Sequence, residues 1–268
     1  MTSDPAADTR WAAARTERGR SFGAVAADYA AWRPGYPGEL VAFLAGGEDG
    51  HTQPRRILDL GAGTGQLSES LVAAGHDVVA ADTSADMLAQ LAVRLPGVPT
   101  FVARAEDLPL PDGDVDAIVA AQAAHWFDPA VAGREFQRVL RPGGAVGFVW
   151  HMREESAPWA VALNQLLAAD ARDQQGDRPE GNQAVVDAFA AELGAEVETR
   201  TTRWVQRVPP EAVVGRVASS SRIALLDDAG REAYLGQVRQ LLATHPDTRG
   251  RDELEVSYRT SAYRLTPR

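Results

Sequence analysis

The spacing of hydrophobic residues alternates between two patterns in the first half of the chain. Short continuous apolar runs, typical of strands buried on both faces of a sheet, are followed by segments whose apolar residues recur every three or four positions, as on one side of a helix. The runs predict five strands, at residues 57–60, 77–81, 100–103, 115–121 and 145–150. Strands that alternate with helices indicate a parallel, doubly wound sheet, whose ligands bind at the carboxyl ends of the strands.

The segments between these strands have the apolar side expected of helices. Leu67 and Leu71 mark the first helix, and Met87 lies on the apolar side of the second. Thr83 and Asp86 predict a capping box at the start of that second helix. The other elements predicted in this region are a helix at 131–140 and an Arg-Pro-Gly-Gly turn at 141–144.

The two ends of the chain are less regular. Phe22, Val25, Tyr29 and Trp32 recur at helical spacing and predict a short amphipathic helix, which Pro34 ends. The further elements predicted outside the alternating region are helices at 37–46, 210–218 and 228–243 and strands at 197–208 and 253–265. The last strand is expected to run antiparallel to its neighbour.

Together these elements predict a single α/β domain over residues 21–268. Its fold class is Rossmann-like and doubly wound, with a mostly parallel seven-stranded sheet, an antiparallel last strand and an N-terminal helical lid. Residues 1–20 are polar and charged and are expected to be a disordered tail. Residues 21–50 are expected to form the N-terminal cap helices, and residues 152–195 a lid insertion.

A glycine-rich loop, Asp59-Leu-Gly-Ala-Gly-Thr-Gly65, joins the first predicted strand to the helix that follows it. Glycines at every second position let the backbone turn tightly and come close to a ligand, and free N–H groups at the helix start can meet polar ligand atoms. A nicotinamide dinucleotide site has the spacing G-x-G-x-x-G, but Gln66 stands where the third glycine would fall. The loop therefore suits an adenosyl ligand that carries an amino acid; a tight turn with no ligand is the alternative.

A second acid supports the adenosyl reading. Asp82 lies 21 residues after Gly61, at the end of the second predicted strand. A carboxylate there can accept hydrogen bonds from both ribose hydroxyls. The alternative is an acid placed at a helix amino terminus, where the helix dipole favours it. The combined order of strand, acid, three glycines, helix, strand and acid favours the ligand site.

In these segments the chain resembles the class I S-adenosylmethionine-dependent methyltransferases, specifically the type 11 small-molecule group, and is similar to trans-aconitate methyltransferases. The resemblance covers residues 20–151 well and the final third loosely. The segments that carry it are 61–65, 78–88, 105–112, 122–127, 139–144 and the N-terminal Tyr29-x-x-x-Arg33-Pro34-x-Tyr36-Pro37. It implies S-adenosylmethionine as the cofactor.

The resemblance also implies roles for individual residues. Asp59 and the glycine loop would hold the methionine portion, and Asp82 would bind the ribose. Met87 would pack on the adenine, whose edge would meet Glu106 and the backbone of Ala105. The residues expected to bind the cofactor are Asp59, Gly61, Ala62, Gly63, Gly65, Asp82, Thr83, Met87, Ala105, Glu106 and Gln122.

Two histidines are the candidates for chemistry. His125 follows the fourth predicted strand and His151 the fifth, so both fall on the ligand edge of the sheet. Methyl transfer from a sulfonium is an in-line displacement that gains from alignment and exclusion of water, and needs a general base only where the acceptor must lose a proton. Either histidine could be that base; the alternative is a hydrogen-bonded histidine in the pocket wall.

Aromatic and arginine residues are the candidates for holding the acceptor. Trp126 and Trp150 follow strands four and five and are expected to line an apolar pocket, with core packing as the alternative. Arg33 or Arg222 could pair with a carboxylate. The residues expected on the acceptor side or in the lid are Tyr29, Trp32, Arg33, Tyr36, Trp126, Trp150 and Arg222.

Composition removes several classes of function. The net charge of −10 and the lack of a basic run argue against a nucleic-acid partner. The chain contains neither cysteine nor lysine, which excludes thiol catalysis, disulfides and Schiff-base chemistry. The histidines lack ligand spacing, so no metal site is expected. No apolar stretch reaches the ~20 residues that span a bilayer, and we expect a cytoplasmic monomer or homodimer without a membrane partner.

The sequence thus predicts an enzyme that methylates a small molecule, with the oxygen of a hydroxyl or carboxylate as the expected acceptor, in specialised metabolism. The preference for oxygen rests on the family resemblance and on the two histidines. Nitrogen and carbon acceptors are alternatives. So are a cyclase-like enzyme that keeps the cofactor without methylating, and a non-catalytic binding protein, because a fold does not determine a function.

Overall fold

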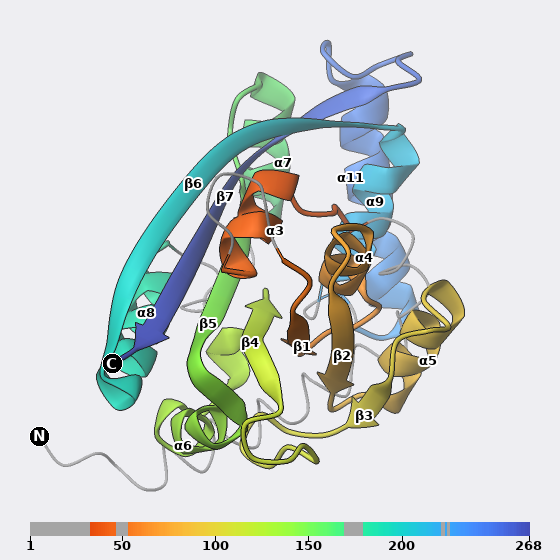
Figure 1. Cartoon of the computed structure of the whole chain (residues 1–268). Helices are drawn as coiled ribbons and strands as arrows, with labels where there is room; N and C mark the ends of the chain where they lie inside the picture. Colours follow the sequence, from red (N-terminus) through yellow and green to blue (C-terminus); the bar gives the residue numbers. More distant parts are fainter. Residues whose placement is uncertain (1–32, 47–52, 169–178, 221–222, 224–225) are drawn as a thin grey trace, which may run out of the picture.

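The computed structural model describes residues 33–46, 53–168, 179–220, 223 and 226–268. Its centre is a seven-stranded sheet in the order β3-β2-β1-β4-β5-β7-β6 (Figure 1). The strands are β1 (Arg56–Leu60), β2 (Asp77–Asp82), β3 (Thr100–Val102), β4 (Val115–Ala121), β5 (Leu140–Arg153), β6 (Ala195–Val208) and β7 (Leu254–Pro267). The first five are parallel, and β7 runs antiparallel to both β5 and β6. The predicted Rossmann-like fold class is confirmed.

Helices cover both faces of the sheet. The helices of the described residues are α3 (Gly38–Leu44), α4 (Gln66–Ala73), α5 (Ala85–Arg94), the 3-10 turn η2 (Ala124–Trp126), α6 (Pro129–Val139), α7 (Pro158–Ala168), α8 (Pro179–Leu193), α9 (Pro210–Ala218) and α11 (Asp228–Thr244). Apolar side chains of α3, α4 and α5 pack on one face. On the other face, Phe136 of α6 and Phe189 of α8 are fully buried and stack with ring centroids 5.5 Å apart.

A second core lies beyond the end of β5. The strands β6 and β7 continue past it, so that the first four residues of β7, 254–257, pair with β6 alone. Trp159 and Leu163 of α7 pack there against buried residues of α9 and α11, such as Val213 and Val238. We call this cluster, formed by α7, α9, α11 and the adjoining ends of β6 and β7, the second core. It places a separate layer of helices beyond the carboxyl end of β5 (Figure 1).

The region expected to be a lid insertion, 152–195, contains two different parts. The described portion of α8 belongs to the sheet core, where Val186 and Phe189 are fully buried. By contrast, α7 belongs to the second core. The amphipathic helix expected around residues 22–32 lies outside the described residues.

Two local predictions were wrong. The fifth strand was expected to begin after a turn at 141–144, but β5 already begins at Leu140, which pairs with Val115. Residues 141–144 form an irregularity within the strand, and regular pairing with β4 resumes at Ala145. The capping residue of α5 is Ser84, not Thr83. Ser84 has extended backbone angles, and its hydroxyl accepts a hydrogen bond from the Met87 N–H at 3.3 Å.

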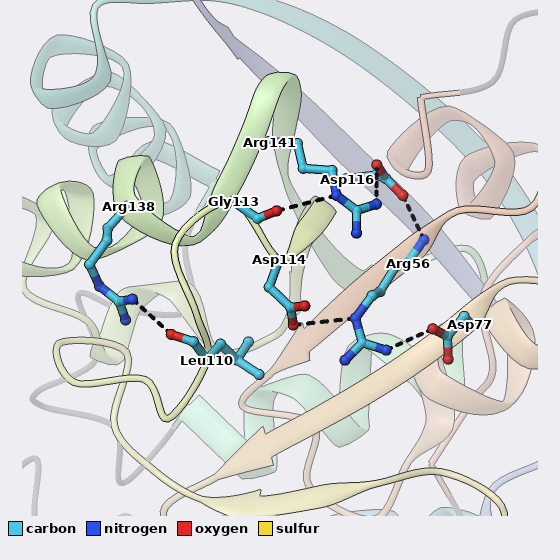
Figure 2. Close-up of polar contacts among 8 residues, drawn as sticks. All are labelled: Arg56, Asp77, Leu110, Gly113, Asp114, Asp116, Arg138 and Arg141. Atoms are coloured by element: carbon cyan, nitrogen blue, oxygen red, sulfur yellow. Dashed lines mark hydrogen bonds and ion pairs between the residues drawn. The ribbon is translucent and has the colours of Figure 1, made fainter.

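The amino ends of the parallel strands are joined by charged side chains (Figure 2). Arg56, at the start of β1, contacts Asp77 of β2 at 2.7 Å and Asp114 at 3.2 Å. Asp116 accepts a hydrogen bond from the Arg56 backbone N–H and pairs with Arg141 at 2.8 Å. This network lies at the edge opposite the carboxyl ends of the strands, so it stabilises the strand starts and leaves the ligand edge free.

Among the described residues, no helix combines the length and apolar character that crossing a membrane would require.

Candidate functional site

The glycine loop turns back onto the end of β2. Gly61, Gly63 and Gly65 have φ angles of +68°, +55° and +87°, in the region that favours glycine. The Gly61 and Ala62 N–H groups donate to the carbonyl of Ala81, at 2.8 and 3.1 Å. A Cβ added at Gly61 would lie 2.5 Å from the Ala123 side chain. The loop is therefore held in one tight conformation that a larger residue at position 61 would disrupt.

Asp82 lies directly beside this loop, as the sequence predicted. One carboxylate oxygen accepts a hydrogen bond from the Gly63 N–H at 2.9 Å, and the other accepts one from the Ser84 N–H at 2.8 Å. Burial raises the pKa of Asp82, and these N–H groups act in the opposite direction. The carboxylate thus joins the carboxyl end of β2 to the glycine loop, at the edge where an adenosyl ribose would bind.

Asp59 is completely buried at the end of β1. Its Oδ2 accepts a hydrogen bond of 2.6 Å from the Ser68 hydroxyl, whereas Oδ1 forms no hydrogen bond. Burial is the main cause that raises the pKa of Asp59 to about 7; the Ser68 contacts lower it and the charge of Asp82 raises it. A buried carboxylate oxygen without a partner is costly and fits a cationic group, such as the ammonium of a methionine moiety.

The remaining residues predicted to meet the adenine lie around α5 and after β3. Met87 and Ala105 are buried, with 3% of each exposed. The carboxylate of Glu106 already has protein partners: it accepts a hydrogen bond from the Asp128 N–H at 3.0 Å and forms an ion pair with Arg104 at 3.2 Å. Thr83 is exposed between Asp82 and the capping Ser84. Their contact with a cofactor stays a prediction.

Gln122, at the ligand edge, has an unusual backbone conformation. It is the non-glycine residue with a positive φ angle among the described residues, at +57°. Its N–H donates to the Val149 carbonyl at 2.9 Å, and its side chain donates to the His151 carbonyl at 3.4 Å. Such strain clusters at functional sites. Gln122 therefore connects the carboxyl ends of β4 and β5 beside the glycine loop.

The segment after Gln122 brings the first predicted base to the same edge. His125 lies in η2, partly buried, with its ring 4.7 Å from that of Trp126. Ala123, two residues earlier, packs so close to Gly61 that a side chain at position 61 would collide with it. His125 and Trp126 are thus near the glycine loop, and their roles stay predictions.

His151, the second predicted base, is enclosed by aromatic rings. Tyr36 stacks on it with ring centroids 4.3 Å apart, and Trp204 and Tyr258 lie at 5.6 and 5.7 Å. Burial lowers its pKa to about 3, the nearby charges of Arg33 and Arg216 add to this lowering, and the Gly35 backbone opposes it. His151 is therefore neutral near pH 7, and a weak base.

For Trp150 the structure favours the alternative, core packing. Adjacent residues of a strand point to opposite faces, so Trp150 and His151 cannot line the same pocket. The Trp150 side chain is 1% exposed and packs in the sheet core near Phe148 and Tyr263.

Two predicted lid residues connect the N-terminal segment to the acceptor side. Arg33 donates to the Ser219 hydroxyl at 3.2 Å and to its carbonyl at 3.3 Å, just after α9. Tyr36 is the residue that stacks on His151. We call residues 33–37 the strap, because they join the sheet edge to the second core. Tyr29, Trp32 and Arg222 lie outside the described residues.

Several residues on this side were not foreseen from the sequence. Arg216 of α9 donates to the Tyr258 hydroxyl and, at 2.6 Å, to Gln206. Thr260 of β7 is fully buried between His151 and Trp204. A pocket opens nearby, lined by residues that include Arg153, Trp159, Leu163, Val213, Arg216 and Val256. No motif marks these positions, since strand pairing and the packing of α7 and α9 bring them together. Among the described residues, no cluster of three potential metal ligands occurs.

Known proteins share this architecture over nearly its whole length. The methyltransferase domain family matches residues 58–148. An uncharacterized methyltransferase of Mycobacterium tuberculosis is 38% identical over 252 residues, 94% of this chain and 98% of the relative. One of Schizosaccharomyces pombe is 29% identical over 251 residues, 91% and 96% of the two chains. A solved structure from Anaeromyxobacter dehalogenans, named as a type II methyltransferase, superposes with a TM-score of 0.65 at 26% identity, covering 89% of this chain and 98% of the other.

Proposed function

Because the chain belongs to the S-adenosylmethionine-dependent methyltransferases, we propose that it transfers a methyl group from that cofactor to an oxygen atom of a small molecule. When bound, the cofactor supplies an electrophilic methyl group on a sulfonium. The protein contributes alignment of the two reactants and a site from which water is excluded. The finer statements, oxygen as the acceptor atom and a small molecule as the acceptor, rest on the following observations.

The observation that carries the proposal is the convergence of three groups at one edge of the sheet. The glycine loop, the buried carboxyl of Asp59 and the carboxylate of Asp82 come together at the carboxyl ends of β1 and β2. The unpartnered Oδ1 of Asp59 fits the cofactor's ammonium group. Asp82, which the N–H groups of Gly63 and Ser84 hold in place, would accept hydrogen bonds from the ribose hydroxyls.

The acceptor side supports an oxygen atom. Two guanidinium groups, of Arg33 and Arg216, lie close enough to His151 to lower its pKa. Such surroundings favour an acceptor with a carboxylate or another electron-rich oxygen, and a carboxylate needs no general base. The strap and the second core enclose this side, which suits a small molecule.

The proposal can be tested with radiolabelled cofactor. The purified chain is incubated with methyl-labelled S-adenosylmethionine and a panel of carboxylic acids, phenols, amines and activated carbon acids, and labelled product is separated from cofactor. We expect transfer to a carboxylic acid or phenol. Transfer only to amines or carbon acids would refute the oxygen assignment. Conversion of a panel compound without release of S-adenosylhomocysteine would favour the cyclase-like alternative.

Cofactor binding needs a separate measurement. We expect Asp82→Asn to weaken S-adenosylhomocysteine binding in calorimetry by about tenfold or more, since charged hydrogen bonds contribute about 1.5–3 kcal/mol. The matched control is Asp86→Asn, which removes an exposed acid from the first turn of α5. Equal affinity for the two variants would contradict the assigned site.

A further inference from the structure

The hydroxyl of Thr260 forms a hydrogen-bond chain with two rings. Trp204 of β6 lies 2.8 Å from it through its indole nitrogen, and His151 of β5 lies 2.7 Å from it through Nδ1. Thr260 belongs to β7, between these strands, and its side chain is fully buried. These two hydrogen bonds therefore depend on the pairing of three strands, β5, β7 and β6.

Donor chemistry determines the direction of one of these hydrogen bonds and favours one direction for the other. The Trp204 indole N–H can only donate, so the Thr260 oxygen accepts there. The hydroxyl proton of Thr260 then has one acceptor within reach, the Nδ1 of His151. A proton on Nδ1 would leave that hydroxyl proton without an acceptor, so the arrangement favours an unprotonated Nδ1. Since the ring is neutral, its single proton resides on Nε2.

The Nε2 atom of His151 is buried and forms no hydrogen bond of normal geometry with any described residue. The backbone of Gly35 in the strap lies close enough to the ring to favour its protonated form. A buried N–H without an acceptor of good geometry destabilises the folded protein, so an acceptor atom of a ligand would bind there favourably. His151 lies near the carboxyl end of β5, two residues beyond the last one that pairs with β4, and is joined through its carbonyl to Gln122. Its Nε2–H is therefore near the edge at which a methyl acceptor must meet the cofactor.

We propose that Trp204 and Thr260 are positioning residues that hold His151 as its Nε2–H tautomer, and that this N–H donates a hydrogen bond to an oxygen of the bound methyl acceptor. His151 is then a hydrogen-bond donor that orients the acceptor, in place of the general base that its position in the sequence indicates. This inference rests on the proposed function, because it takes the acceptor to be an oxygen compound. The strap must yield slightly to admit that oxygen in place of the Gly35 backbone.

The tautomer can be read without any turnover. The full chain is labelled with ¹⁵N-histidine, and long-range ¹H–¹⁵N spectra identify the protonated nitrogen of His151, assigned by its loss in His151→Gln. We expect a protonated Nε2 and a bare Nδ1 in the wild type and in Thr260→Ser, which keeps the hydroxyl. In Thr260→Val, of similar shape but without the hydroxyl, we expect a mixture of tautomers. A proton on Nδ1 in the wild type would overturn the proposal.

The role in binding is read from kinetics with the panel compound that is methylated fastest. For Thr260→Val we expect KM for that compound to rise about tenfold, the equivalent of one misplaced hydrogen bond, with kcat changed less and with rescue by Thr260→Ser. Trp204→Phe, which keeps the ring but loses the N–H, should move KM in the same direction. Unchanged KM in both Thr260→Val and Trp204→Phe would overturn the positioning role.

Two further measurements separate the possible failures. Calorimetry with S-adenosylhomocysteine shows whether Thr260→Val is folded, since the cofactor side should bind as in the wild type. If it is not, Trp204→Phe carries the kinetic test. A hydrogen bond from Nε2–H to the Gly35 carbonyl that persists with acceptor and S-adenosylhomocysteine bound would overturn the contact with the acceptor. If no compound of the panel were methylated, the proposed function would be contradicted. The tautomer of His151 would still be tested by the ¹H–¹⁵N spectra, which need no turnover.

Discussion

The two sides of the candidate site are built in different ways. The centre of the expected cofactor side comes from one continuous segment, residues 59–68, with Asp82 added from the next strand; the expected adenine contacts, such as Met87, lie further along the chain. The acceptor side is assembled from the strap, β5, β6, β7 and α9, and its Arg33–Ser219 contact joins residues 186 positions apart. A local segment can hold a ligand that many proteins share. In a site assembled from distant segments, a substitution can change one contact without altering the others. We therefore expect the choice of acceptor to depend on this side.

The largest expected effect tests how rigid the cofactor side is. Gly61→Ala forces a Cβ within 2.5 Å of Ala123 at a positive φ angle. We expect S-adenosylhomocysteine affinity to fall on the order of 100-fold, because the loop must move away from its ligand position. The control is Gly75→Ala, with φ of +88° but nothing within 4 Å of the added Cβ. It should cost about 1 kcal/mol of stability and leave calorimetric affinity unchanged. Similar losses of affinity in both variants would show that backbone strain alone is responsible.

Asp59→Asn should separate stability from binding. The pKa of Asp59 is raised to about 7, so between its ordinary value and pH 7 the folded protein keeps a proton that the unfolded chain has lost. The stability associated with this proton is complete at low pH and declines as pH rises toward 7. In urea unfolding at pH 8 we expect the variant to be more stable than the wild type by on the order of a few kcal/mol, with the difference shrinking toward pH 4.

The same substitution should weaken cofactor binding by about tenfold, because Asn cannot neutralise the cofactor's ammonium group. A variant that is less stable than the wild type at pH 8, or that binds S-adenosylhomocysteine normally, would contradict the account of Asp59 given above.

A smaller effect is expected at the strap. Arg33→Ala removes two hydrogen bonds to Ser219 and a charge near His151. We expect KM for the acceptor to rise severalfold, as for the loss of one or two partly buried hydrogen bonds, and affinity for S-adenosylhomocysteine to stay within about twofold of the wild type. The control is Arg203→Ala, which removes an exposed partner of Glu154. If Arg33→Ala lowered only the affinity for S-adenosylhomocysteine, Arg33 would belong to the cofactor side of the site.

The smallest effect is expected at the opposite edge of the sheet. Asp77→Asn removes one partner of Arg56 in the network of Figure 2, where the Asp77 side chain is 60% exposed. Exposed ion pairs contribute about 0–1 kcal/mol, so thermal unfolding should change little and methyl transfer should not change. A large drop in activity would mean that the amino edge communicates with the site.

The placement of the glycine loop and its two acids could be predicted from the sequence, for reasons visible in particular residues. Asp82 could be paired with the glycine loop because strands of a parallel sheet end at a common edge. Ser68 was missed although it lies on the predicted helix, because a serine there has no pattern that indicates contact with Asp59. The clustering of aromatic residues in the sequence does not show that Trp150 packs in the core, because the alternation of strand faces turns it away from His151.

The sequence by itself determined the order of strands and helices, the glycine loop and its two acids, since these depend on the period of apolar residues and on spacing within short segments. Only the tertiary structure decided what surrounds His151. The register of β7 between β5 and β6 sets Thr260 against both His151 and Trp204, and a shift of one residue would turn its side chain to the other face. That register depends on packing of the whole sheet and the second core, which no local pattern records. The same histidine that reads as a base in the sequence is, in the folded protein, neutral and hydrogen-bonded.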